Sequence, residues 1–108
     1  MSGGGPQKKR PDKSKDVLAK ARKCLESGRF YDTRHAIDQK SARAISLLEI
    51  RMIIETGFWE RKKDEYKPEY QAWSYSIRGK TIDNRDLRII ISFDKEVLLF
   101  ITAIDKDN

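Results

Sequence analysis

Residues 73–104 read WSYSIRGKTIDNRDLRIIISFDKEVLLFITAI, and this stretch decides the fold. Apolar and polar residues alternate over residues 73–78 and again over residues 87–93, which predicts two half-buried β-strands. Residues 97–104 are apolar on both faces, as in a strand from the interior of a sheet. The connections between these segments are too short for a crossover helix, so we expect neighbouring strands to run antiparallel.

The residues just before this stretch add a further strand. Residues 58–63 (FWERKK) carry so many charges that they predict a strand at the edge of the sheet. Residues 66–70 (YKPEY) predict a turn built around Pro68. The expected sheet therefore has about four strands.

Helical signals come first in the chain. Residues 17–25 place apolar side chains on one helical face, after a candidate N-cap at Ser14. Asp32 or Thr33 can cap a second helix over residues 34–43.

A third helix has the clearest boundaries. Ser46 and Glu49 have the spacing of a capping box, and Gly57 is placed to end the helix. We therefore expect an α+β fold in which two to three N-terminal helices pack on one face of a curved antiparallel sheet of about four strands.

The chain has 108 residues, which is the length of one domain. Residues 1–13 are rich in Gly, Pro and Lys without apolar periodicity, so we expect a disordered basic tail. Residues 14–108 are expected to form a single α+β domain. The net charge of +6 belongs to residues 1–30, because residues 31–108 hold equal numbers of basic and acidic side chains. A basic face on the domain would have to arise by clustering.

The composition excludes several kinds of site. Cys24 is the single cysteine and lies on the apolar face of the first helix, so we expect a buried thiol and no intramolecular disulfide. One cysteine and one histidine are too few for the usual four-ligand zinc site, and we expect no metal and no cofactor. No apolar run reaches the length of a membrane span, and no secretory signal is present, so we expect a cytoplasmic protein with no membrane partner.

Two motifs resemble a known family. The first is HAIDQKSARAIS at residues 35–46, which matches the pattern H-A-x-x-R-M-x-x-R-G-I-S at five positions and departs from it at Gln39, Lys40 and Ala44. The second is GKTIDNRDLRIIISF at residues 79–93, with Asn84 where glycine is usual. These motifs resemble a family of small bacterial domains of unknown function that is placed near the RelE, ParE and BrnT toxins, and the resemblance covers about residues 30–105.

The resemblance implies a RelE/BrnT-like fold and carries a functional expectation. Toxins of that group cleave messenger RNA or poison gyrase, and each pairs with an antitoxin. The resemblance therefore implies a toxin–antitoxin type mRNA endonuclease, with RNA as substrate and an antitoxin as protein partner. A shared fold does not by itself transfer an activity.

Metal-independent RNA cleavage needs a base, an acid and cations over the phosphate. His35 has the ordinary pKa closest to neutrality, which makes it the candidate base or acid; its alternative role is a hydrogen bond to a neighbouring strand. Arg78 and Arg88 lie on adjacent predicted strands and on the same, less apolar face. If they converge they suit a phosphate, and otherwise they are ordinary surface charges.

Three further residues are candidates for nucleic-acid binding. Arg43 follows His35 on a nearby helical face and either contacts phosphate or forms a salt bridge. Lys80 flanks the turn between the two arginine strands and adds to the same patch. Trp59 on the edge strand is the aromatic candidate for stacking on a base.

Two other functions compete with the endonuclease. A non-catalytic protein-interaction domain agrees with the neutral charge of residues 31–108 and with the lack of a complete catalytic motif. Nucleic-acid binding through the basic residues 1–13 is the third hypothesis, and it predicts a salt-dependent affinity.

Overall fold

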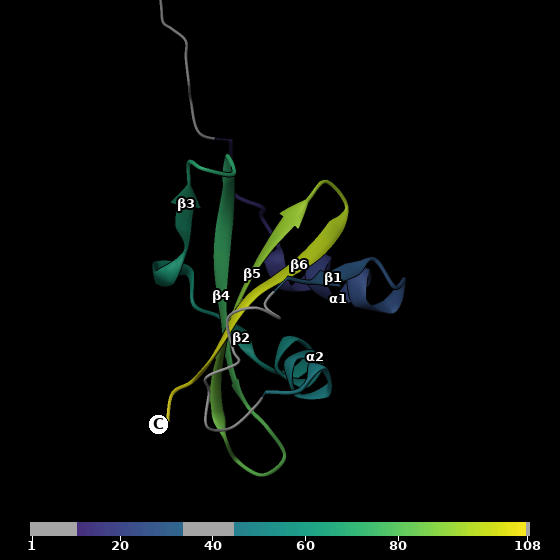
Figure 1. Cartoon of the computed structure of the whole chain (residues 1–108), viewed down its shortest axis with the longest axis vertical. Helices are drawn as coiled ribbons and strands as arrows, with labels where there is room; N and C mark the ends of the chain where they lie inside the picture. Colours follow the sequence, from purple (N-terminus) through teal and green to yellow (C-terminus); the bar gives the residue numbers. More distant parts are fainter. Residues whose placement is uncertain (1–10, 34–44, 108) are drawn as a thin grey trace, which may run out of the picture.

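The computed structural model describes residues 11–33 and 45–107. The elements in chain order are α1 (Val17–Glu26), β1 (Phe30–Asp32), α2 (Leu47–Thr56), β2 (Phe58–Trp59), the 3₁₀ turn η3 (Arg61–Lys63), β3 (Glu65–Lys67), β4 (Ala72–Lys80), β5 (Asp86–Asp94) and β6 (Val97–Asp105). Figure 1 shows β4, β5 and β6 as the long central strands, with both helices beside them.

The three long strands form an antiparallel meander, as the alternation predicts. The strand order is β1-β6-β5-β4-β2, and β3 also pairs with β4. The ladder between β5 and β6 is irregular between Ile90 and Ile91, which shifts the register there. β2 and β3 are short pieces that pair with different parts of β4, so one long strand carries two neighbours on the same side.

The prediction of an antiparallel sheet of about four strands is wrong. Within residues 11–33 and 45–107 the sheet has six strands and is mixed, because β1 runs parallel to β6 with Phe30 opposite Leu98. The predicted strand over residues 58–63 ends at Trp59 and continues as η3, and part of the predicted turn over residues 66–70 belongs to β3. Strands of two or three residues are too short to show an alternating pattern, so only pairing with a distant strand reveals them.

The described residues contain two α-helices with the expected apolar faces. The capping box at the start of α2 is confirmed, since the Ser46 hydroxyl accepts from the Glu49 amide and the Glu49 carboxylate accepts from the Ser46 amide. The N-cap of α1 is Asp16 and not Ser14. The helix predicted over residues 34–43 lies outside the described residues. Neither α-helix is long and apolar enough to cross a membrane, among the residues described.

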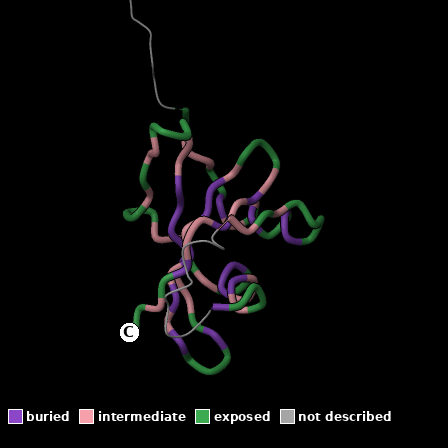
Figure 2. Tube along the Cα trace, in the orientation of Figure 1, coloured by how far each residue is buried: buried purple, intermediate pink, exposed green. Residues whose placement is uncertain are grey.

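Both helices pack on the same face of the sheet. The buried side chains of α1 and α2, including Cys24, join those of β4, β5 and β6 in one core. Figure 2 colours the buried stretches of the chain purple. Two glycines mark the closest approach, because a Cβ on Gly79 would meet the side chain of Ile53 at 3.4 Å and the Cα of Gly57 at 3.1 Å. Gly79 therefore faces α2, and residues 74, 76 and 78 of β4 point to the other side. We call that other side, with Ser76, Arg78 and Arg88, the polar face.

The end of the predicted tail is in contact with the domain. Residues 1–10 lie outside the described residues, while Pro11 and Lys13 contact Trp73 and Asp64.

Candidate functional site

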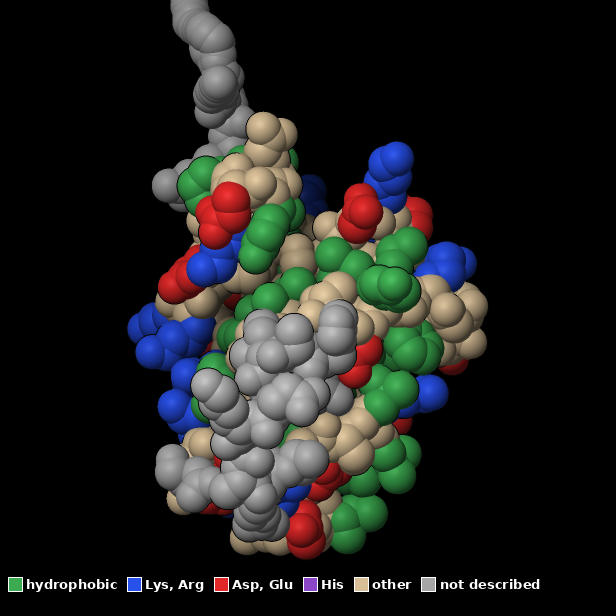
Figure 3. Space-filling model, viewed as in Figure 1, with side chains coloured by type: hydrophobic (Ala, Val, Ile, Leu, Met, Phe, Trp, Pro, Cys, Tyr) green, Lys and Arg blue, Asp and Glu red, His purple; other side chains and the backbone are tan. Residues whose placement is uncertain are grey.

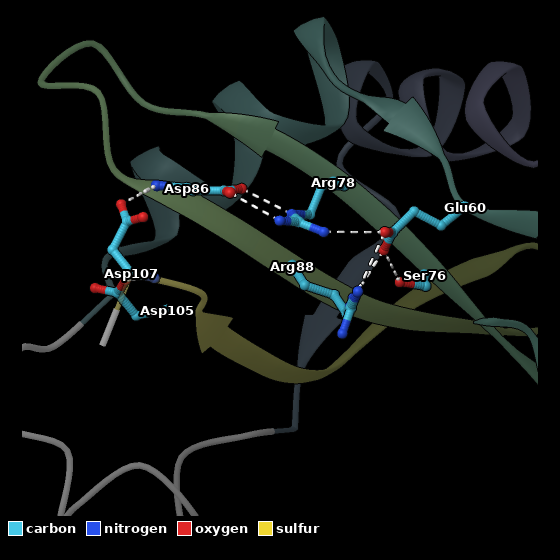
Figure 4. A network of polar contacts seen from close by, with 7 residues as sticks. All are labelled: Glu60, Ser76, Arg78, Asp86, Arg88, Asp105 and Asp107. Carbon is cyan, nitrogen blue, oxygen red and sulfur yellow. Dashed lines mark hydrogen bonds and ion pairs between the residues drawn. The ribbon is translucent and has the colours of Figure 1, made fainter.

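Arg78 of β4 and Arg88 of β5 lie directly opposite each other on the polar face. Both guanidinium groups point toward Glu60, as Figure 4 shows. Arg88 donates from Nε to Glu60 Oε1 at 2.7 Å and from Nη2 to Oε2 at 3.2 Å, and Arg78 donates from Nη1 to Oε2 at 3.2 Å. Of the two alternatives that the sequence leaves open, the two arginines converge, and a carboxylate lies between them.

Glu60 reaches this position because the chain leaves the sheet there. Phe58 of β2 pairs with Arg78, and the Glu60 amide donates to the carbonyl oxygen of Ser76 at 2.8 Å. The Ser76 hydroxyl in turn donates to Glu60 Oε1 at 2.6 Å. The edge pairing of β2 thus aligns Glu60 with Ser76, and its side chain extends over the polar face toward the arginines.

Asp86 completes the cluster at the start of β5. It accepts two hydrogen bonds from Arg78, at 2.7 Å from Nε and at 2.8 Å from Nη2, which is the bidentate geometry that arginine and carboxylate favour. The Asp86 amide donates to the side chain of Asp107 at 3.0 Å. We call Glu60, Arg78, Asp86 and Arg88 the arginine–carboxylate cluster; its formal charges balance.

The cluster holds its carboxylates in the ionised form. The hydrogen bond from Arg88 is the main reason that the pKa of Glu60 falls to about 2, against a smaller opposing effect of burial. The hydrogen bond from Arg78 likewise lowers the pKa of Asp86, and Asp86 raises the pKa of Arg78. The four side chains are between 13% and 26% exposed, so solvent reaches all of them.

Basic side chains flank Glu60 along the chain. η3 has the sequence Arg61-Lys62-Lys63, and all three residues are exposed. In Figure 3 Lys and Arg side chains gather at the left edge of the molecule, on the side where Figure 1 places η3. Residues 31–108 carry no net charge in sum, and yet they form a local basic edge beside the arginine–carboxylate cluster.

A second cluster of ion pairs connects α2 to the sheet. Arg85 is buried and bonds Glu49 of α2 at 2.9 Å and Asp105 of β6 at 3.1 Å. The Glu49 side chain that completes the capping box therefore also ties α2 to the ends of two strands. These ion pairs attach α2 to the sheet. The polar face carries the arginine–carboxylate cluster instead.

The structure brings together only part of the predicted site. Arg78 and Arg88 meet, and Lys80 lies opposite Asp86, where its positive charge helps to lower the pKa of that carboxyl. His35 and Arg43 lie outside the described residues.

Trp59 is on the other side of the sheet from the arginines. It pairs with Ile77, which faces the helices, and its ring packs edge-on against Tyr75 with 6.0 Å between centroids. Its indole nitrogen donates to both carboxylate oxygens of Asp64, at 3.0 and 3.1 Å. The structure therefore places Trp59, the aromatic candidate for stacking on a base, on the face opposite the two arginines.

Sequence reasoning missed Glu60 and Asp86. Asp86 could have been found, because it is the first residue of the strand that carries Arg88 two positions later on the same face. Glu60 gave no such signal, since its place depends on pairing between β2 and β4, which are far apart in sequence. Among the residues described, no three His, Cys, Asp or Glu side chains gather as metal ligands.

Comparison with known proteins identifies one family. No curated protein and no solved structure matches the chain significantly. The sequence model of a family described as a domain of unknown function (DUF4258) matches residues 33–105, which include α2, every strand except β1, and all four members of the arginine–carboxylate cluster. The chain therefore belongs to the family of domains of unknown function DUF4258.

Proposed function

We propose that this domain binds RNA on its polar face and cleaves it without a metal ion, as an endonuclease of the toxin–antitoxin type. The observation that carries the proposal is the convergence of Arg78 and Arg88 on the ionised carboxylate of Glu60. Two guanidiniums and a carboxylate on a solvent-accessible sheet surface are the elements that phosphate recognition and proton removal require. The resemblance of residues 30–105 to domains placed near RelE and BrnT toxins supports the same class of reaction.

The reaction assigned to the cluster is attack of a ribose 2′-hydroxyl on the adjacent phosphorus. Glu60 takes the 2′-hydroxyl proton while the 2′-oxygen forms its bond to phosphorus. Arg78 and Arg88 donate to the phosphate oxygens as negative charge develops on them. The bond from phosphorus to the 5′-oxygen breaks, and the leaving oxygen takes a proton from a general acid, a role that we assign to His35, the sequence candidate for base or acid. The products are a 2′,3′-cyclic phosphate and a 5′-hydroxyl.

The low pKa of Glu60 describes the resting state of this site. A carboxylate with a pKa of about 2 is a weak base, and it is weak because the arginines donate to it. A phosphate that accepts hydrogen bonds from Arg88 and Arg78 withdraws those donors from Glu60, so substrate binding raises the pKa of the carboxyl. The exposed basic residues of η3 supply charge for the neighbouring phosphates of the strand.

The test is cleavage of single-stranded RNA in the presence of EDTA, with the products examined for cyclic phosphate ends. We expect the Glu60→Gln variant, which keeps the size of the side chain, to lose about 10²–10⁴-fold in rate. Arg88→Gln should lose activity as well. Arg51→Gln on α2 is the matched control, because it removes the same charge at a residue outside the cluster. Equal rates for the Glu60→Gln variant and the wild type, with both folded, would overturn the mechanism.

A second candidate is a non-catalytic domain that binds a protein. A groove of about 700 Å³ is lined in part by the apolar residues Tyr70, Phe93, Leu99 and Ile101. Its lining also includes Asp94 and Lys95, so a partner segment would meet both apolar and charged groups. Under this alternative Ile101→Lys abolishes complex formation with the partner, Arg88→Gln leaves it intact, and the wild type does not cut RNA.

A further inference from the structure

Lys13 is held in a site made by two aromatic rings and one carboxylate. Its ammonium nitrogen lies 2.8 Å from Asp64 Oδ2, 5.2 Å from the centre of the Trp73 ring and 5.7 Å from that of Trp59. Each of these contacts favours a positive charge, the carboxylate directly and the indoles through the negative faces of their rings. We call Trp59, Asp64 and Trp73 the ammonium site.

The carboxylate of Asp64 is buried to a degree unusual for a charged group. Its side chain is 1% exposed. The Trp59 indole donates to both oxygens, and the Ser76 amide lies 3.4 Å from Oδ1. Neutral donors of this kind orient a carboxylate, but a buried negative charge also needs a cation. Lys13 supplies that cation, so the surroundings of Asp64 fit a positively charged occupant.

Hydrogen bonds to the sheet hold the backbone on both sides of Lys13. The Trp73 indole nitrogen donates to the carbonyl oxygen of Pro11 at 2.8 Å, and the Ser14 amide donates to the Tyr75 hydroxyl at 3.0 Å. Residues 11–14 therefore form a strap along β4, with the Lys13 ammonium within about 6 Å of the centres of both indole rings. The side chain remains 35% exposed, so solvent reaches the site while it is occupied.

We propose that Trp59, Asp64 and Trp73 form a recognition site for primary alkylammonium groups, the chemical class of the lysine side chain, and that Lys13 occupies it in the free chain. Lys13, which belongs to the strap of residues 11–14, thus acts as an intramolecular ligand of the site. Because the occupant is tethered, its effective concentration is of the order of millimolar, and a lysine from another chain enters only in competition with Lys13. This assignment does not rest on RNA cleavage.

The two tryptophans of the chain both line the site, so intrinsic fluorescence reports on it without a label. The Lys13→Ala variant removes the ammonium and three carbons, a gap that n-propylammonium matches. We expect the variant to change the tryptophan emission, and added n-propylammonium to restore the wild-type spectrum with saturation at millimolar concentration. The wild type should respond about tenfold more weakly, because its own lysine competes.

Four controls isolate recognition of the ammonium. n-Propanol has the same length without the charge and should not restore the spectrum, and sodium chloride corrects for ionic strength. Lys15→Ala removes the same charge at an exposed position two residues away and should leave the emission unchanged. Adding Asp64→Asn to Lys13→Ala should abolish the saturable response; if that protein unfolds, Trp73→Leu in place of Asp64→Asn tests the same point.

Two results would overturn the proposal. One is an emission spectrum of Lys13→Ala identical to that of the wild type, which would mean that Lys13 does not lie against the two indole rings in solution. The other is a response of Lys13→Ala to n-propanol equal to its response to n-propylammonium, which would mean that the gap takes any small molecule and does not recognise charge.

Discussion

Arg78 and Arg88 occupy directly opposed positions on β4 and β5, where two like charges repel each other. The pairing persists because Glu60 accepts hydrogen bonds from both guanidiniums and Asp86 accepts two more from Arg78. The carboxylates therefore hold together a strand pair that the arginines alone would weaken. This relationship makes stability, as well as activity, a test of the cluster.

The first prediction concerns removal of Glu60. The Glu60→Ala variant leaves the two arginines facing each other, and we expect a loss of about 1–2 kcal/mol in the free energy of unfolding after allowance for solvent screening. Urea denaturation measures it. The Glu55→Ala variant removes an exposed carboxylate from α2 and serves as the control, with a change within about 0.5 kcal/mol.

A double-mutant cycle shows whether the loss comes from the cluster. Replacing both Glu60 and Arg88 by alanine should cost less than the sum of the two single changes, because the second change removes a charge that the first left unpaired. Additive losses would mean that the two side chains do not interact in solution.

The second prediction concerns pH. The pKa of Glu60 is lowered from an ordinary value of 4.5 to about 2 in the folded chain, so its ionised form stabilises the fold above pH 4.5. That contribution disappears as the pH falls from about 4.5 to about 2 and the carboxyl takes up a proton. The free energy of unfolding should therefore decline over this range, and more steeply for the wild type than for Glu60→Gln. Parallel curves for the two proteins would contradict the assignment.

The third prediction concerns the contact between α2 and β4. A Cβ on Gly57 would overlap the backbone carbonyl oxygens of Arg78 and Ile53, which cannot move without displacing the strand. We expect Gly57→Ala to destabilise the domain by about 1–3 kcal/mol, as overpacking does. Thermal unfolding followed by circular dichroism gives the change in Tm.

Gly28 provides the comparison for that substitution. It has a φ of 74°, but a Cβ added there would meet no atom of the described residues within 4 Å, so Gly28→Ala introduces backbone strain without a collision among them. We expect a cost of about 1 kcal/mol there, as for an alanine in the left-handed region. A larger loss at Gly28 than at Gly57 would show that the helix and strand are not in close contact.

Local features could be predicted from the sequence wherever their cause is local. The start of α2 follows from Ser46 and Glu49, three residues apart, because each satisfies a backbone group of the same helical turn. The strands that contain Tyr75, Ile89 and Phe100 were recognisable because apolar side chains recur with the period of a β-strand or fill its whole length. Burial of Cys24 followed from its place on an apolar helical face.

Only part of the candidate site could be predicted from the sequence. Arg78 and Arg88 could be assigned to one face of adjacent strands because a short turn joins those strands, while the structure decided that the two residues are directly opposite each other. Glu60 could not be placed, since it reaches the arginines through the two-residue pairing of β2 with β4.

The sequence by itself thus determined the α2 helix with its caps and the β4–β5–β6 meander, where the interacting groups are a few residues apart or separated by a tight turn. Only the tertiary structure decided the parallel pairing of β1 with β6, the position of Glu60 between the two arginines, and the insertion of Lys13 beside Asp64. These contacts join segments that are distant along the chain and too short to carry a periodic pattern. The geometry of these contacts depends on how the helices and the sheet pack and on where that packing places the edges of the sheet. This is a property of the whole fold, and no local stretch of residues encodes it.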